Sequence, residues 1–240
     1  MQRIADAVNH GFTHHISGTV SIDRLPHLVA KFDLNFQVFA DRNVRARRKQ
    51  EKLGNVQIVL WHNNGIVHWW LLATAPEEGE HHIHKAEKLR NALDRTGRFE
   101  IDGFELVRLP YKENKNIPKK ENKNIPEKAK PKADSKKATC LTWRMSEQKY
   151  QDWRLSIIDT VRSRSTNNMH HLLYRLYSSP GFSGIRSQIG KLAALYLAEV
   201  KRAAIKEAPK PPKRLGYVRR LKHSGITLLQ LVAQAKSGTQ

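Results

Sequence analysis

Apolar residues recur at steps of three and four along the last 100 residues, which is the period of an amphipathic helix. The stripes run over Tyr150–Val161, Met169–Leu176, Ile185–Ala203 and Leu228–Ala235. Ser146 precedes the first stripe and Asn167 or Asn168 the second, as helix caps would, and Ser183 opens the third. We therefore expect an all-α domain over residues 140–240.

Alternating apolar and polar positions dominate residues 1–110 and predict strands. These segments are His15–Ile22, Asp33–Phe39, Val56–Trp61, Ile66–Thr74 and Phe99–Leu109. Asn64-Gly65 predicts a hairpin and Asp102-Gly103 a tight turn. His84–Arg95 has helical spacing, with Gly97 as its stop. Together these elements predict an α+β domain, an antiparallel sheet with one helix.

The hairpin around Asn64-Gly65 is rich in aromatic residues. Trp69 and Trp70 are adjacent and should point to opposite faces of the sheet, one into the core and one free to stack. His62 and His68 flank the turn, and we expect them to oppose each other across it.

Residues 111–139 are expected to form a Lys/Pro-rich disordered linker. The motif KENKNIP occurs twice, at Lys112–Pro118 and Lys120–Pro126, with almost no apolar group to bury. Prolines interrupt any continuous helix there. The segment is therefore expected to be a flexible tether between the α+β domain and the helical domain.

Charge identifies the partner that the chain favours. Lysine and arginine number 43 against 22 acids, for a net charge of +21 and a pI near 10.3. Residues 1–108 carry 15 bases and 13 acids, residues 109–140 carry 10 and 4, and residues 141–240 carry 18 and 5. Such an excess indicates an anionic partner, and nucleic acid is its commonest form.

Several classes of chemistry have no motif in the chain. Cys140 is the only cysteine, so no intramolecular disulfide and no cysteine-rich zinc site are expected. Phosphate-binding loops, nucleophile elbows and HExxH motifs are absent. We expect no cofactor, no transmembrane segment, no metal and a cytoplasmic location associated with the nucleoid or a nucleoprotein.

The residues predicted to contact phosphate are basic and lie mostly off the apolar stripes or in basic runs. They are Arg45, Arg47, Arg48, Arg154, Arg162, Arg164, Arg175, Arg186, Lys191, Arg214, Arg219, Arg220 and Lys222. Arginine suits this role because its planar guanidinium donates two parallel hydrogen bonds to a phosphate. The run Arg42–Lys49 is expected to be a loop between strands, and Tyr217 lies within the last cluster as a stacking ring.

The turn Ser178–Gly184 between two predicted helices allows two interpretations. A helix-turn-helix would place Arg186 and Gln188 near base edges. The turn is longer than that motif uses, which favours a plain helical hairpin.

His82-Ile83-His84 is a histidine–hydrophobe–histidine triplet. It resembles the metal-binding motif of replication initiators and conjugative relaxases. That resemblance implies a single-strand DNA nuclease in which two histidines hold a divalent metal and a tyrosine attacks a phosphate. The candidate tyrosines are Tyr111, Tyr150, Tyr174 and Tyr177.

The sequence thus predicts a non-catalytic nucleic-acid-binding protein, acting in replication, transfer or regulation of a bacterial-type genetic element. DNA is favoured over RNA because helical basic domains are common in DNA binding and no RNA-binding module is recognisable. The metal-dependent nuclease is one alternative. A protein-interaction adaptor on a nucleoprotein or ribosomal complex, using the near-neutral N-terminal domain, is the other.

Overall fold

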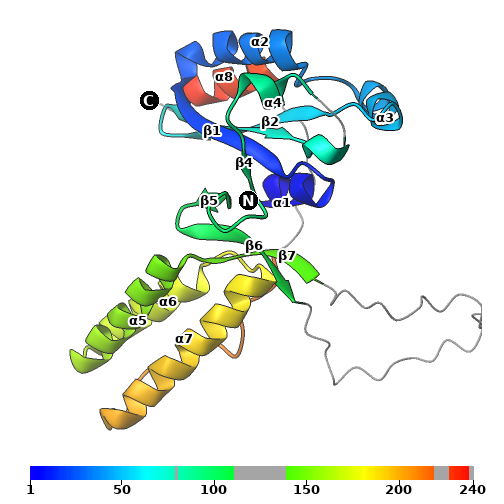
Figure 1. The fold of residues 1–240 in the computed structure, drawn as a ribbon. Coiled ribbons are helices and arrows are strands. Elements are labelled where there is room, and N and C mark those ends of the chain that lie inside the picture. The colour runs from blue at the N-terminus through cyan, green and yellow to red at the C-terminus, as the bar shows by residue number, and fades with distance from the viewer. Residues whose placement is uncertain (79–80, 111–138, 219–226, 238–240) are drawn as a thin grey trace, which may run out of the picture.

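The chain folds into a mixed α+β structure that contains two antiparallel sheets (Figure 1). The computed structural model describes residues 1–78, 81–110, 139–218 and 227–237. A four-stranded sheet with its helices lies at one end, a three-stranded sheet lies in the middle, and three long helices extend from the other end (Figure 1).

The four-stranded sheet has the order β2-β3-β1-β4. Its strands are β1 (His14–Ser21), β2 (Val56–Asn63), β3 (Ile66–Ala73) and β4 (Arg90–Asn91). The predicted hairpin is confirmed: Asn64 and Gly65 join β2 to β3 with φ of 48° and 77°. Both values are left-handed, as a two-residue hairpin turn requires.

Helices α2 (Leu25–Phe36) and α8 (Leu228–Ser237) cover one face of this sheet (Figure 1). The predicted strand over Asp33–Phe39 is wrong, because its first residues belong to α2. Leu25, Val29, Phe32 and Phe36 are buried at helical spacing, and this longer stripe outweighs the short alternation that suggested a strand.

Two further predictions for the N-terminal half are wrong. The helix expected over His84–Arg95 is reduced to α4 (Ile83–Ala86), because Arg90 and Asn91 pair with β1 as strand β4. The loop expected over Arg42–Lys49 is helix α3 (Arg42–Gln50), whose first turn is capped by Asp41 accepting from the Val44 N–H at 2.8 Å. With α1 (Gln2–Asn9), this half therefore has more than one helix.

The three-stranded sheet consists of β5 (Glu100–Ile101), β6 (Phe104–Pro110) and β7 (Thr139–Met145). The predicted turn is confirmed, with Asp102 and Gly103 at φ of 52° and 71°. Pro110 is the register partner of Thr139, so the strands on either side of residues 111–138 pair with each other. The segment 140–240 is not all-α as predicted, because it begins with β7.

The predicted helices are α5 (Glu147–Arg162), α6 (Thr166–Tyr177) and α7 (Ser183–Arg202). Ser146 caps α5 as expected, whereas α6 is capped by Ser165 rather than by Asn167 or Asn168. The chain then folds back along the helices. The Tyr196 hydroxyl donates a hydrogen bond to the Pro209 carbonyl at 2.9 Å, and the Tyr177 hydroxyl donates one to the Pro212 carbonyl at 2.8 Å.

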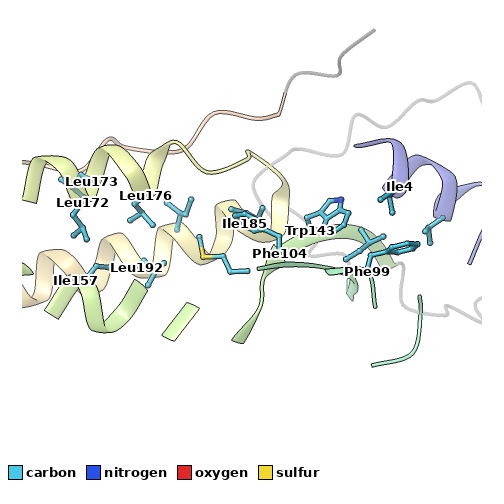
Figure 2. Close-up of a cluster of buried hydrophobic side chains, with 14 of the residues drawn as sticks. Ile4, Phe99, Phe104, Trp143, Ile157, Leu172, Leu173, Leu176, Ile185 and Leu192 are labelled. Atoms are coloured by element: carbon cyan, nitrogen blue, oxygen red, sulfur yellow. The ribbon is translucent and has the colours of Figure 1, made fainter. Parts of the chain in front are cut away.

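One buried cluster runs from α1 through the three-stranded sheet into the three helices (Figure 2). Trp143 lies fully buried in it and donates its indole N–H to the Met1 carbonyl at 3.1 Å. The helices and the N-terminal α1 thus share a core, and the predicted two-domain layout is not confirmed. Among the described residues, no helix is both long and apolar enough to cross a bilayer.

Candidate nucleic-acid interface

Basic side chains project from the three helices and the segment after them. Those that are exposed are Arg154, Arg162, Arg164, Arg175, Lys191 and Arg214, whereas Arg186 is half-buried. The predicted contacts Arg219, Arg220 and Lys222 lie outside the described residues. Within the described part of the chain, none of Arg154, Arg162, Arg175, Lys191 and Arg214 forms an ion pair with a carboxylate.

A groove of about 240 Å³ lies between α5 and α6, lined by Lys149, Asp152, Trp153, Ser156 and Arg175. The Arg175 guanidinium stands 5.6 Å above the Trp153 ring. The Lys149 ammonium donates to the Asp102 carbonyl at 2.8 Å. Two cationic groups and one carboxylate thus surround an aromatic ring, an arrangement suited to a phosphate beside an apolar surface.

The N-terminal end of α7 is docked on β7. The Gln188 amide accepts from the Met145 N–H at 2.7 Å and donates to the Met145 carbonyl at 3.1 Å. The Thr142 hydroxyl accepts from the Gly184 N–H at 3.1 Å, and a Cβ at Gly184 would stand 2.6 Å from the Trp143 carbonyl oxygen. The structure therefore does not support α7 as a recognition helix, because its first turn faces the protein.

Two of the arginines predicted to contact phosphate, Arg186 and Arg164, instead form hydrogen bonds within the helical half. Arg186 donates through Nε to the Leu215 carbonyl at 2.9 Å, and its guanidinium lies 3.4 Å from the centroid of the Tyr217 ring. Tyr217 is itself 74% exposed. Arg164 has a left-handed φ of 56° and donates to the Ala203 carbonyl at 3.3 Å. Both arginines position neighbouring backbone and are only partly available to a ligand.

Of the three arginines of α3 predicted to contact phosphate, Arg45 and Arg48 form hydrogen bonds within the protein and Arg47 is exposed. Arg45 donates to the Val38 carbonyl at 2.9 Å, and burial lowers the pKa of its guanidinium. Arg48 donates to the Gln37 side chain at 2.6 Å. Both bonds tie α3 to the turn after α2, where Gln37 is left-handed. Arg47 remains exposed, 3.9 Å from Glu51 on the next helical turn.

A second cavity, of about 230 Å³, lies between the two sheets and was not predicted. Three arginines line it, Arg90, Arg95 and Arg98, together with Ser17, Glu105 and the fully buried His15. Arg98 pairs with Glu105 at 3.0 Å, and Arg144 pairs with the same carboxylate at 2.6 Å. The net charge of residues 1–108 is close to zero, so the charge count did not single out these arginines. No pattern in the sequence predicts that they lie near β1.

His15 is neutral in this cavity wall. Its ring is 2% exposed and its Nε2 donates to the Gly97 carbonyl at 2.7 Å, because a carbonyl oxygen can only accept. Burial lowers the pKa of His15 to about 4, against the opposing effect of the Gly97 bond. Its Nδ1 is therefore an acceptor, and it is buried without a hydrogen-bond partner in the described structure.

The histidine triplet opens a short helix and does not lie on a strand. His82 precedes and His84 lies within the short α4, rather than on a central strand. The His82 ring lies 6.2 Å from that of Phe36, and the His84 ring lies 5.7 Å from that of His14. Tyr111 lies outside the described residues. Within the described ranges, no group of three or more His, Cys, Asp and Glu side chains could hold a metal ion.

The expected pair of hairpin histidines is also wrong. His68 is the register partner of Trp61, and His62 that of Val67, so His62 and His68 lie on opposite faces of the sheet.

Comparison with known proteins finds no matching family model, no matching curated protein and no matching solved structure.

Proposed function

We propose that the protein binds nucleic acid without catalysis, and DNA in preference to RNA, through the basic surface of α5, α6 and α7 and residues 213–218. The observation that carries this proposal is the set of exposed basic side chains that lack ion-pair partners among the described residues: Arg154, Arg162, Arg175, Lys191 and Arg214. An ordinary solvated helix surface mixes charges of both signs, whereas residues 141–240 hold 18 bases and 5 acids.

Phosphate contacts are the chemistry that this surface offers. Each arginine donates several hydrogen bonds in one plane, and each cation that meets a phosphate releases condensed counterions from the nucleic acid. The exposed Tyr217 ring and the groove beside Trp153 add aromatic surface next to cations. In this proposal the helical part acts as a binding module beside the Lys/Pro-rich linker, in a cytoplasmic nucleoprotein, for the replication, transfer or regulation of a genetic element.

The test is a triple variant with Arg154→Gln, Arg162→Gln and Lys191→Gln. These side chains are exposed, so the fold should be retained. Binding to a 20-base-pair duplex should weaken for all sequences alike. The slope of log K against log salt should become shallower by about 0.9 for each phosphate that the variant no longer neutralises.

The matched control is Arg24→Gln, Lys31→Gln and Lys52→Gln, three exposed bases of the N-terminal half that remove the same charge. This control should bind almost as the wild type does. If both triple variants weaken binding equally, total charge rather than the helical surface drives binding, and the proposal is wrong.

A further inference from the structure

The four-stranded sheet has an aromatic row on the face opposite to α2. Trp61 and His68 are cross-strand partners with ring centroids 5.1 Å apart, and the Trp70 ring lies 6.2 Å from that of His68. Trp69 points to the other face and contacts Phe32 of α2 at 5.1 Å, as strand alternation requires. Trp61 stands on the edge strand β2 and is 46% exposed. Nearly half of the Trp61 surface is thus accessible at the sheet edge.

This row leads across the sheet to the arginine-lined cavity. Trp70 lines the cavity, and its register partner on β1 is Ser17. The Arg90 guanidinium, on the next strand, lies 3.4 Å from the Ser17 hydroxyl. Neighbouring strands lie about 4.8 Å apart, so β2 and β4 are separated by about 14 Å across this face. Trp70 is itself only 8% exposed, so the exposed Trp61 ring and the arginine-lined cavity are two separate positions on the same face of the sheet.

The cavity offers groups that would recognise a phosphate ester. Arg90 and Arg95 form no ion pair in the part of the chain that the structure describes, and both are exposed. Two carboxylates, Glu100 and Glu105, also line the cavity, and Glu105 is shared between Arg98 and Arg144, which offsets its repulsion of an anion. Two exposed guanidinium groups without a carboxylate partner among the described residues suit the phosphodiester of a nucleic-acid backbone.

We infer that this face binds a single strand of nucleic acid, with an unpaired base stacked on Trp61 and a backbone phosphate in the cavity at Arg90 and Arg95. An unpaired strand fits better than a duplex, because a stacking ring needs a base that is free of its neighbours in a helix. The inference rests on the proposed function in requiring nucleic acid as the partner, but it uses different residues. The protein would then hold single-stranded nucleic acid at the sheet and duplex phosphates at the helices.

The experiment measures the affinity of the full chain for two probes at the same salt concentration, a fluorescein-labelled fifteen-nucleotide oligothymidylate and the 20-base-pair duplex. Trp61→Ala should weaken oligothymidylate binding roughly 5- to 150-fold, the range for loss of one stacked base, and leave duplex binding unchanged. Phe39→Ala is the matched control, because Phe39 is a 55% exposed aromatic ring away from this face. It should change neither affinity.

A second pair of variants tests the cavity. Arg90→Gln with Arg95→Gln should weaken oligothymidylate binding and flatten its salt dependence, whereas Arg24→Gln with Lys31→Gln should not. Urea unfolding of each variant checks that the fold is intact. Loss of oligothymidylate binding with retained duplex binding supports the inference.

Four results would overturn one proposal or both. Unchanged oligothymidylate affinity in the Trp61 and cavity variants refutes this inference alone. Equal competition by polyglutamate and by unlabelled oligothymidylate also refutes it, because the site would then take any acidic chain. Unchanged duplex binding in the helical triple variant refutes the proposed function alone. A wild-type protein that binds neither probe refutes both.

Discussion

Replacing Gln188 by alanine tests the docking of α7 on β7. Gln188 makes two hydrogen bonds to the Met145 backbone, at 2.7 and 3.1 Å, and Met145 is 1% exposed. β7 is an edge strand, paired with β6 on one side only. The amide of Gln188 thus completes the hydrogen bonding of the free edge of β7.

The variant leaves a buried N–H and a buried carbonyl without partners. Each such group costs about 1–3 kcal/mol, and alanine regains a few tenths through helix propensity. Partial hydration at the half-buried site of Gln188 reduces the total, so we expect a loss of about 2–4 kcal/mol in the free energy of unfolding. For a chain of this size the urea midpoint should fall by about 1 M.

Equilibrium urea unfolding, followed by circular dichroism, measures this loss. The matched control is Gln148→Ala on α5, where the exposed glutamine side chain donates to the Asp152 side chain at 2.7 Å. It should change the free energy of unfolding by less than about 0.5 kcal/mol. If Gln188→Ala is as mild as the control, then α7 is not anchored to β7, and its first turn is free to contact DNA bases.

Three other predictions concern the histidines and residues 111–138. Because burial lowers the pKa of His15 to about 4 while the unfolded value is 6.5, the unfolded state binds more protons between these values and stability falls as the pH drops through that window. Between pH 7 and pH 5 His15 contributes about 2 kcal/mol to this loss, and burial also lowers the pKa of His81 to about 4, which adds a loss in the same direction. His15→Gln should therefore lose about 2 kcal/mol less than the wild type over this range, whereas the exposed His10→Gln should lose as much as the wild type, as measured by urea unfolding at both pH values. Replacing residues 111–138 by a four-residue turn should raise the free energy of unfolding by about 1.7 kcal/mol if they form the predicted tether, because Pro110 and Thr139 are already paired; a decrease would show that these residues stabilise the fold. Incubation with single-stranded DNA and Mn²⁺ should give no cleavage and no covalent adduct, whereas cleavage lost on His82→Ala would support the nuclease hypothesis.

The sequence predicted best those elements whose pattern is local. The stripes of α5, α6 and α7 span several turns, and the hairpin at Asn64-Gly65 is specified by its own turn residues. The strand over Asp33–Phe39 failed because its alternation is short and the stripe that begins at Leu25 is longer. The run at Arg42–Lys49 failed because no apolar stripe marks α3, which is capped by Asp41 and linked to the preceding turn by Arg45 and Arg48.

The candidate sites differ in the same way: features that depend on local pattern could be predicted, and those that depend on tertiary packing could not. The exposure of Arg154, Arg162 and Lys191 follows from their place off the apolar stripes. The contacts of Arg186 with Leu215 and Tyr217 could not be predicted in this way, because these two residues come from a segment that folds back along the helices. The cavity at His15 is built from strands of both sheets and from the connection between β4 and β5, and only tertiary packing brings these together.

The salt dependence of duplex binding tests the central claim most directly. If three to five of the exposed arginine and lysine side chains on the helical surface contact phosphates, the slope of log K against log salt is about −2.7 to −4.5. The affinity for the 20-base-pair duplex should then fall about 40- to 500-fold between 50 and 200 mM NaCl. An affinity that stays constant over this range would contradict phosphate recognition by these helices.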